Sequence, residues 1–589
     1  MTGQPLSIGL LYKDLDMCGI FGVTGTSNGY RIVREGLLKL AYRGYDSAGI
    51  ACPSTSGGAL LQRTMGHPEN LPDSGPSSSS AIGHTRWATH GEPSEENAHP
   101  HLSMDGGVFV VHNGIIENYL TLKEGLIEEG YSFYSETDTE VIPNLIEKHY
   151  KTCHNAKQAI ESVLPLLEGS FSIVVMFLRE PINLYVAKKG SPLLIGSTPD
   201  LTYYVSSDRG SFPKDTFQYA DISEGVVLQL RPNCPIEGVR WKPFSSKTDD
   251  YELDGYNDFM AKEIASQGES LPKLMDSPIL EEIKELFPNA GQIIITGCGS
   301  ALYASQMVAP ALEQKWGIPV RVISAGELQY DDCISTKGGA LIAVSQSGET
   351  ADTLRCVKRF ERLPSIAIHN SNGSSLAHLC DFAGYIHAGK EISVASTKAV
   401  THQAVALLSL AYDLSPYAKD LPLETIFSKY VHISALAHKL AEFKNIVVVA
   451  RGNLVPSAYE TALKIKEICY IHAEAMSASE FKHGPLALID ENMPTLAYVC
   501  KNTESKTASN IQEIKARGGL VFGVLDEKCS KETKSLFDQY VEIPCMDSFP
   551  HLNPILFTIC GQLINYDIAI KLGVSVDRPR NLAKSVTTE

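Results

Sequence analysis

The residue with the clearest chemical potential is Cys18, which follows Met17 and opens the short apolar stretch 19–23. A cysteine in an apolar strand is most often a buried side chain, because free cysteine is among the most buried residue types. If Cys18 is instead the first residue of the mature chain, its own α-amino group, with a reference pKa of about 7.7–8.0, can act as general base for the thiol. This stretch leaves both interpretations open, and motifs further along must decide between them.

Three loops in the first half carry groups that suit a reaction at an amide or acyl carbon. Arg86, in the segment HTRWATHG, can hold a carboxylate with two hydrogen bonds. Asn113 and Gly114 can offer a side-chain amide and a backbone N–H to an oxyanion. Asp138 can hold an amino group or cap the helix that follows it. A metal site is not expected among the histidines of this half, because no acidic or thiol partner stands at ligand spacing.

In the second half, small hydroxyl side chains follow the ends of apolar strands. The strand 341–344 runs into SQSGET, and a helix begins at about Ala351. Backbone N–H groups, hydroxyls and the helix dipole converge there and favour an anion. Segments 298–300 and 394–398 open further helices in the same lobe, so phosphate binding is the favoured interpretation. The equivalent turn of the second lobe, 500–505, reads CKNTES without a glycine, so we expect one phosphate site per chain.

Two further motifs leave alternatives open. Lys464 and Glu467 are three residues apart and share a helical face, as a surface ion pair or as part of a site. His483 precedes Gly-Pro and suits a capping residue as well as an acid/base group in a loop.

The elements that must position these residues change character along the chain. Residues 18–235 are rich in short strands, whereas after about residue 270 apolar strands alternate with long helical patterns, which is typical of parallel α/β units. The segment 293–314 resembles 446–470, which predicts two α/β lobes. One large α/β domain is the alternative.

Composition excludes several classes of protein. The 589 residues carry a net charge of −17, which argues against nucleic-acid binding. We expect no membrane span, because no apolar run approaches about 18 residues; the most apolar helical stretch is expected at 399–414. Thirteen cysteines without a Cys-x-x-Cys pair fit neither a disulfide framework nor a zinc ribbon and favour a cytoplasmic protein.

Together, the motifs CGIFGV, YRGYDSAGIA, HTRWATHG, HNGIIEN and SETDTE, followed by SQSGET, EISVASTKA, IHAEAMSASEFKHGPLALID and VDRPRNLAKSVT, resemble the isomerising glutamine–fructose-6-phosphate aminotransferases. The resemblance runs from Cys18 almost to Glu589. It implies a multidomain protein of α/β and α+β class. The implied parts are an extension (1–17), an N-terminal-nucleophile (αββα) glutamine amidotransferase or glutaminase domain (18–235), a linker (236–274), two parallel-sheet sugar-isomerase lobes (275–415 and 436–575) and a tail (576–589).

The resemblance also implies residue roles in the glutaminase half. Cys18 would attack the amide of L-glutamine, and Asn113 and Gly114 would stabilise the oxyanion. Trp87 would gate the internal passage of ammonia. The residues that would hold glutamine are Arg86, Thr89, His90 and Asp138.

In the sugar half, the resemblance implies that Lys584 forms a Schiff base with fructose 6-phosphate. Glu467, with Lys464 nearby, would move the proton between the first two carbons. His483 would help to open the ring from a neighbouring subunit, so a homodimer is expected; no metal or organic cofactor is expected. The residues that would hold the sugar phosphate are Ser300, Ser345, Gln346, Ser347, Thr350, Val394 and Ser396.

Three features depart from the family pattern. Sixteen residues precede Met17, so we expect translation to begin at Met17 with removal of the methionine, or processing of a short pro-segment. Ser393 stands where glycine is usual, and Ala301 where a second hydroxyl is usual. The alternative functions are a sugar-phosphate isomerase without glutaminase activity, a sugar-phosphate-sensing module and another glutamine-dependent amidotransferase.

Overall fold

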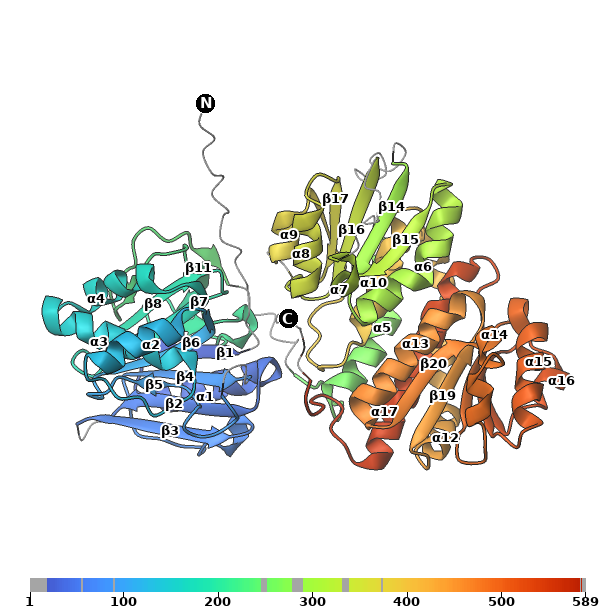
Figure 1. Ribbon diagram of the computed structural model, residues 1–589, viewed down its shortest axis with the longest axis horizontal. Coiled ribbons are helices and arrows are strands. Elements are labelled where there is room, and N and C mark those ends of the chain that lie inside the picture. The colour runs from blue at the N-terminus through green and yellow to red at the C-terminus, as the bar shows by residue number, and fades with distance from the viewer. Residues whose placement is uncertain are drawn as a thin grey trace. The chain divides into compact units, whose positions relative to one another are not determined.

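The computed structural model (Figure 1) describes residues 18–54, 57–87, 91–244, 252–277, 290–330, 338–371, 374–582 and 584. The chain forms two compact units, Met1–Glu252 with Val586–Glu589, and Leu253–Ser585. The division falls inside the stretch 236–274 that the sequence marks as a linker. The second part of that stretch forms helix α5 (Phe259–Met275), whose apolar side chains belong to the core of the second unit.

The first unit contains two antiparallel sheets. The eight-stranded sheet has the order β13-β11-β9-β10-β1-β4-β2-β3, and the five-stranded sheet has the order β12-β8-β7-β6-β5. The strands of the larger sheet are β1 (Gly19–Thr24), β2 (Ser47–Pro53), β3 (Ala59–Met65), β4 (Ser80–Arg86), β9 (Leu194–Ser197), β10 (Tyr203–Ser206), β11 (Gln218–Asp221) and β13 (Lys242–Pro243). Those of the smaller sheet are β5 (His101–Leu102), β6 (Val108–Ile116), β7 (Gly169–Phe177), β8 (Leu184–Lys189) and β12 (Leu228–Leu230).

Side-chain alternation along the strands builds four layers. In β1, Ile20 faces a core shared with Val111 and Val174 of the other sheet, whereas Phe21 packs with Leu37 under helix α1, because successive strand residues point to opposite faces. A third core lies on the other face of the smaller sheet, between that sheet and the helices α2, α3 and α4. The helices are α1 (Gly29–Leu40), α2 (Tyr119–Glu128), α3 (Val141–Cys153) and α4 (Ala156–Val163). The predicted αββα arrangement is confirmed.

The second unit contains two five-stranded sheets whose strands are all parallel, with the orders β15-β14-β16-β17-β18 and β20-β19-β21-β22-β23. The orders are the same when each sheet is numbered from its own first strand, so the predicted pair of parallel-sheet lobes is confirmed. The strands are β14 (Gln292–Gly297), β15 (Val320–Ser324), β16 (Gly339–Ser345), β17 (Ser365–His369) and β18 (Phe382–Tyr385), then β19 (Asn445–Ala450), β20 (His472–Ser477), β21 (Thr495–Val499), β22 (Val521–Asp526) and β23 (Gln539–Ile543).

One continuous hydrophobic core joins the two lobes, and helix α17 runs through it. Its side chains are buried along nearly the whole length. The longer helices are α6 (Ser300–Trp316), α8 (Ala351–Arg359), α10 (Lys398–Ser409), α12 (Tyr430–Leu440), α13 (Val455–Lys464), α15 (Glu504–Lys515) and α17 (Asn553–Leu572). The shorter ones are α7 (Ala325–Leu328), α9 (Ser375–Leu379), α11 (Leu423–Ser428), α14 (Ala478–Phe481) and α16 (Lys531–Lys534).

The expectation that 399–414 is the most apolar helical stretch is wrong. Among the described residues, the segment Pro550–Leu572 alone is long and apolar enough to cross a membrane, and 83% of its most apolar stretch of 18 residues is buried inside the structure. Its apolar character follows from its position, since a helix surrounded by protein on all sides carries apolar residues on every face.

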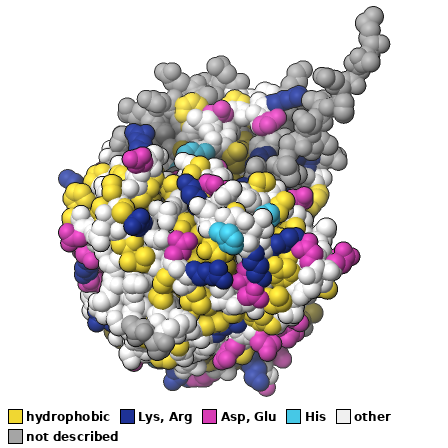
Figure 2. Space-filling view, turned by 90° about the vertical axis from the view of Figure 1, so that its left-hand side faces the viewer, with side chains coloured by type: hydrophobic (Ala, Val, Ile, Leu, Met, Phe, Trp, Pro, Cys, Tyr) yellow, Lys and Arg dark blue, Asp and Glu magenta, His cyan; other side chains and the backbone are white. Residues whose placement is uncertain are grey.

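Figure 2 shows one face of the protein, on which acidic and basic side chains are interspersed. No broad basic patch is visible on that face, which fits the acidic net charge of −17.

Candidate active sites

Cys18 lies half-buried immediately before β1, at the first described position of the chain. The backbone N–H of Trp87 donates to its Sγ at 3.3 Å. Its carbonyl oxygen accepts hydrogen bonds from Arg43 Nε and Asn113 Nδ2, each at 3.0 Å. The residue is therefore held from three sides while its side chain is not fully enclosed, which a nucleophile requires.

Asn113 is fully buried on β6 and is oriented by a histidine. Its Nδ2 donates to Cys18, so its Oδ1 is the acceptor for His84 Nε2 at 3.1 Å. Burial lowers the pKa of His84 to about 3, which keeps the ring neutral. Next to Asn113, Gly114 has φ +116°, and a Cβ there would lie 2.0 Å from the carbonyl oxygen of Ser170. Only glycine fits this bend, which leaves the backbone next to the amide unobstructed.

Arg86 and Asp138 are both buried in the same unit. Burial lowers the pKa of Arg86, whereas the nearby Cys18 and Asp138 act in the opposite direction. The Asp138 carboxylate accepts a hydrogen bond from Ile116 N at 2.7 Å and does not cap helix α3, which begins after Glu140. Trp87 packs edge-on against Tyr45. Thr89 and His90 lie outside the described residues.

In the first lobe, the hydroxyl groups predicted to bind an anion follow strand β16. We call the loop that carries them, Ser345–Thr350, the cradle. Ser345 Oγ lies 2.8 Å from Thr350 Oγ1 and accepts a hydrogen bond from Gly348 N at 3.0 Å. Ser347 Oγ accepts one from Glu349 N at 3.1 Å. Helix α8 then begins at Ala351, as the sequence predicts, so the hydroxyls stand at the positive end of a helix. Gln346 is half-buried in the same loop.

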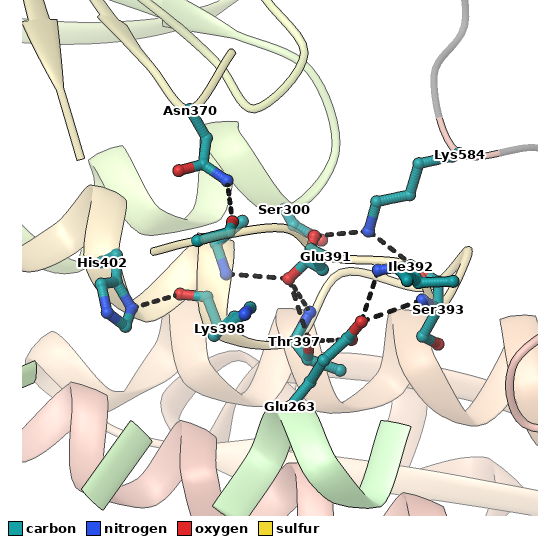
Figure 3. A network of polar contacts seen from close by, with 12 residues as sticks. Glu263, Ser300, Asn370, Glu391, Ile392, Ser393, Thr397, Lys398, His402 and Lys584 are labelled. Atoms are coloured by element: carbon teal, nitrogen blue, oxygen red, sulfur yellow. Dashed lines mark hydrogen bonds and ion pairs between the residues drawn. The ribbon is translucent and has the colours of Figure 1, made fainter. Parts of the chain in front are cut away.

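Lys584 reaches from the C-terminal tail into a buried network (Figure 3). Its Nζ donates to Glu391 Oε2 at 2.5 Å and to the carbonyl oxygen of Ser393 at 2.6 Å. The other oxygen of Glu391 accepts from the backbone N–H groups of Thr397 and Ala399. Although burial opposes ionisation, the pKa of Glu391 is lowered by Lys584 and by these donors.

A second carboxylate, that of Glu263, holds the loop that contains Ser393. Glu263, on α5, accepts hydrogen bonds from Ile392 N, Ser393 N and Thr397 Oγ1. Its own pKa is raised to about 7, by burial and by the charge of Glu391. Val394, which follows Ser393, is buried, and Ser396 is half-buried. Because Ser393 N and O both take part in the network, the unusual serine does not disrupt the backbone there.

The pair predicted on one helical face, Lys464 and Glu467, is largely buried and is not a surface ion pair. Lys464 also lies 3.6 Å from Glu460, whose Oε1 accepts a hydrogen bond from Ser300 Oγ at 3.0 Å. Burial opposes the charge on Lys464, but Glu460 and Glu467 raise its pKa. The pKa of Glu460 is raised to about 7 by burial and by Glu467.

Glu467 occupies a single π-helical turn, Ile465–Cys469, a feature often found at functional sites. It lines an open cavity of about 490 Å³ together with Tyr470 and the tail residue Arg580. Arg580 stacks over the Tyr470 ring, and its backbone N–H donates to the Tyr470 hydroxyl. These contacts hold the tail close to Glu467 and thereby place Lys584. His483 is exposed in the turn after α14.

Four residues of these networks are missing from the sequence-based set. Glu391 lies inside the quoted motif EISVASTKA, and Glu460 precedes Lys464 by one helical turn, so both had a local signal. Glu263 had none, because the backbone groups that it accepts from, Ile392 N and Ser393 N, are 129 and 130 residues away. His84 opens the quoted motif HTRWATHG, but its role depends on Asn113, which is 29 residues away.

Two domain families match the chain. The glutamine amidotransferase domain matches residues 84–213, and the SIS domain matches residues 286–412 and 439–571. The fold and the two sites therefore define a glutamine amidotransferase domain followed by a double SIS domain.

Curated relatives extend this match to almost the whole chain. Glutamine–fructose-6-phosphate aminotransferase [isomerizing] of Clostridium perfringens is 37% identical, over 97% of this chain and 100% of its own length. The Photorhabdus laumondii protein of the same name is 38% identical, with the same coverage. The C-terminal domain of glucosamine-fructose-6-phosphate aminotransferase from Francisella tularensis covers 56% of this chain and 100% of its own, at 34% identity and a TM-score of 0.51. The chain belongs to the family of isomerising glutamine–fructose-6-phosphate aminotransferases and is an enzyme.

Proposed function

We propose that this enzyme converts L-glutamine and fructose 6-phosphate to glutamate and glucosamine 6-phosphate. The observation that carries the proposal is the buried amine of Lys584, held beside Glu391 at the hydroxyl-rich edge of the first lobe, in a chain that also positions Cys18. An amine can condense with the ketone of a ketose, and a thiol can attack the carbon of an amide. Each half of the reaction therefore has a nucleophile.

In the glutaminase step, the Cys18 thiol adds to the amide carbon of glutamine. The tetrahedral oxyanion is stabilised by Asn113 and Gly114, ammonia leaves, and water hydrolyses the thioester to glutamate. Arg86 and Asp138, with Thr89 and His90, bind the ends of the amino acid. The step requires Cys18 to carry a free α-amino group, and we therefore propose that residues 1–17 are absent from the mature chain.

In the sugar step, Ser345, Ser347 and Thr350, with Ser300 and Gln346, bind the phosphate and hydroxyls, and Val394 and Ser396 line the sugar. The Lys584 amine condenses with the ketone and releases water. Ammonia, passed internally with Trp87 as gate, displaces the lysine. Glu467, with Lys464 beside it, then moves the proton from the first to the second carbon. Before attacking, the Lys584–Glu391 pair must release one proton, because an ammonium is not a nucleophile.

The test is product formation with glutamine as the nitrogen source. The purified chain, with fructose 6-phosphate and glutamine, is assayed for glucosamine 6-phosphate beside Cys18→Ala and a Cys153→Ala control. We expect Cys18→Ala to lose more than about 10³-fold of glutamine-dependent activity, and Cys153→Ala to retain it. Mass spectrometry of the same samples gives the first residue. A Cys18→Ala variant as active as the parent with glutamine would refute the nucleophile assignment.

We further propose that the enzyme is a cytoplasmic homodimer in which His483 completes the neighbouring subunit's sugar site. The exposure of His483 supports the shared site. Twelve described cysteines that form no disulfide suit a reducing compartment. Co-expression of His483→Ala with Lys584→Ala tests the shared site, since mixed dimers regain one intact site. Activity no higher than that of either variant alone, in confirmed mixed dimers, would contradict it.

A further inference from the structure

The second lobe carries a cluster of metal-ligating side chains at the edge where the first lobe carries its hydroxyl cradle. Cys500 directly follows β21, Asp526 is the last residue of β22, and Cys545 follows the end of β23 by two residues. The three strands are neighbours in one parallel sheet. Their carboxyl ends therefore bring together three side chains that are far apart in the sequence.

The distances within this cluster suit a single small cation. Cys500 Sγ lies 4.0 Å from Cys545 Sγ and 3.8 Å from Asp526 Oδ2, and the three ligand atoms all lie within 4.8 Å of one another. Ligands at zinc–sulfur and zinc–oxygen distances of about 2.3 and 2.0–2.2 Å in a tetrahedron are separated by about 3.5–3.8 Å. A cation at the centre thus needs only small shifts of the side chains.

The Asp526 carboxylate of the cluster has hydrogen-bond donors but no cationic side chain paired with it among the described residues. Asp526 is buried, and it accepts hydrogen bonds from the backbone N–H groups of Lys501 and Lys528. The ammonium groups of these lysines bind elsewhere, to Glu504 and Asp547 respectively. No described side chain makes an ion pair with the Asp526 carboxylate, and a buried carboxylate is stabilised by a cation.

The surroundings also orient the ligands. Asn553 Nδ2 lies 3.8 Å from Cys500 Sγ, and Asn553 Oδ1 accepts a hydrogen bond from Met546 N, next to Cys545. Asn553 thereby ties the two cysteine-bearing segments together, as residues surrounding metal sites commonly do.

We propose that Cys500, Asp526 and Cys545 bind one thiophilic divalent cation, of the Zn²⁺ class, with water in a fourth position. Two thiolates and one carboxylate select a soft or borderline metal over Mg²⁺ or Ca²⁺. On binding, each thiol loses its proton to solvent and forms a metal–sulfur bond, so no oxidant or reductant is consumed. The site is separate from the Lys584 network and does not depend on the proposed function.

The test uses the reduced full-length chain, freed of metal by chelation, with Zn²⁺ in equilibrium dialysis and Cd²⁺ as a spectroscopic probe. We expect one equivalent of metal per chain, release of protons, and thiolate-to-Cd²⁺ absorption in the ultraviolet. Cys500→Ser and Cys545→Ser should lose this equivalent. Asp526→Asn replaces an anionic ligand by a neutral one and should bind at least about 10-fold more weakly, since even residues that only surround a metal site contribute that much. The matched control is Cys529→Ser, a buried thiol of the same lobe whose Sγ donates to Val499 O; it should bind as the parent does.

The proposal would be overturned if the parent chain bound no stoichiometric metal, or if Cys529→Ser lost as much binding as Cys500→Ser. It would also be overturned if Cys500 and Cys545 formed a disulfide and still bound no metal after that disulfide was reduced. Circular dichroism of every variant identifies those that fail to fold. If both serine variants unfold, Asp526→Asn decides: parental affinity in that folded variant rejects the site. Formation of glucosamine 6-phosphate is assayed separately, so failure of either proposal is distinguishable.

Discussion

The two lobes of the second unit have the same strand order, yet the carboxyl ends of their strands carry opposite chemistry. In the first lobe, Ser345 and Thr350 present hydroxyls beside the start of a helix, which suits an anion. In the second lobe, Cys500 and Asp526 occupy the equivalent edge and suit a cation. The shared scaffold determines where a site forms, and the loop side chains determine what it binds.

The lobes are nevertheless not independent. Glu460, on α13 of the second lobe, accepts a hydrogen bond from Ser300 of the first, and the tail brings Lys584 to Glu391. The first lobe supplies the loops that hold a ligand, while the second lobe and the tail supply charged groups. The following substitutions test this division of roles.

Lys584→Met should have the largest effect, a fall of about 10³-fold or more in product formation. The change removes the amine and leaves Glu391 buried without its cation, which should also lower the free energy of unfolding by about 3–5 kcal/mol. Steady-state rates and urea unfolding measure both. The control is Lys515→Met in the second lobe, whose half-exposed ion pair with Asp538 should contribute at most about 1 kcal/mol. Equal effects of the two substitutions would show that the charge of Lys584 has no special role.

Glu460→Gln should change how stability depends on pH. Because the folded pKa, about 7, exceeds the unfolded value of about 4.3, the folded chain binds the proton more tightly. Stability attributable to Glu460 therefore falls as pH rises from about 4 to about 7, by about 3 kcal/mol in all. The variant should lose part of this slope; Glu263, also near 7, retains the rest.

Urea midpoints measured from pH 4 to pH 8 test this prediction. The exposed Glu532 of α16 provides the control variant, Glu532→Gln, whose slope should match that of the parent. An unchanged slope in Glu460→Gln would mean that this carboxyl ionises normally in the folded chain.

Gly348→Ala should raise the KM for fructose 6-phosphate by about 30-fold, equivalent to about 2 kcal/mol. Gly348 has φ +70°, and a Cβ would lie 2.3 Å from Ser374 Oγ and 2.5 Å from its Cβ, so the cradle must open. The matched control, Gly518→Ala, has φ +80° and open space around the added carbon. Both variants carry the backbone strain, so a KM that rises equally in both would place the cause outside the cradle.

Ser347→Ala should have the smallest effect, a rise of about 10-fold in the same KM, since it removes one hydroxyl and its bond from Glu349 N. Thr503→Ala alters the equivalent turn of the second lobe, where Thr503 Oγ1 donates to Cys500 O, and should leave KM within about twofold. Substrate titrations at constant glutamine give both values. A larger rise in Thr503→Ala than in Ser347→Ala would reverse the roles assigned to the lobes.

Local sequence patterns predicted the individual elements well. The strand before Ser345 and the helix from Ala351 lie where the alternation of apolar residues and the SQSGET turn indicate, since such signals act over a few residues. No continuous apolar run predicts helix α17, because polar residues such as Asn553 and Gln562 interrupt it and are buried with the rest. Whether an apolar helix crosses a membrane or fills a core depends on its packing.

The candidate sites, like the fold, were predictable from the sequence only in part. Cys18, Asn113 and Lys464 were identifiable because each stands in a distinctive motif. The burial of Lys464 between Glu460 and Glu467, and the support of Glu391 by Glu263, were not identifiable. Their chemistry depends on charges brought together from distant segments.

Contiguous residues were enough to predict the order of the domains, the repeat of the two lobes and the candidate nucleophiles Cys18 and Lys584, because each is encoded in local motifs. Only folding brings particular carboxylates next to Lys584 and Lys464, and only folding brings together two cysteines and an aspartate at the ends of three strands of the second lobe. Such neighbourhoods arise when parallel strands end at one edge of a sheet, and the distance between their ends in space is not recorded in the spacing of residues along the chain.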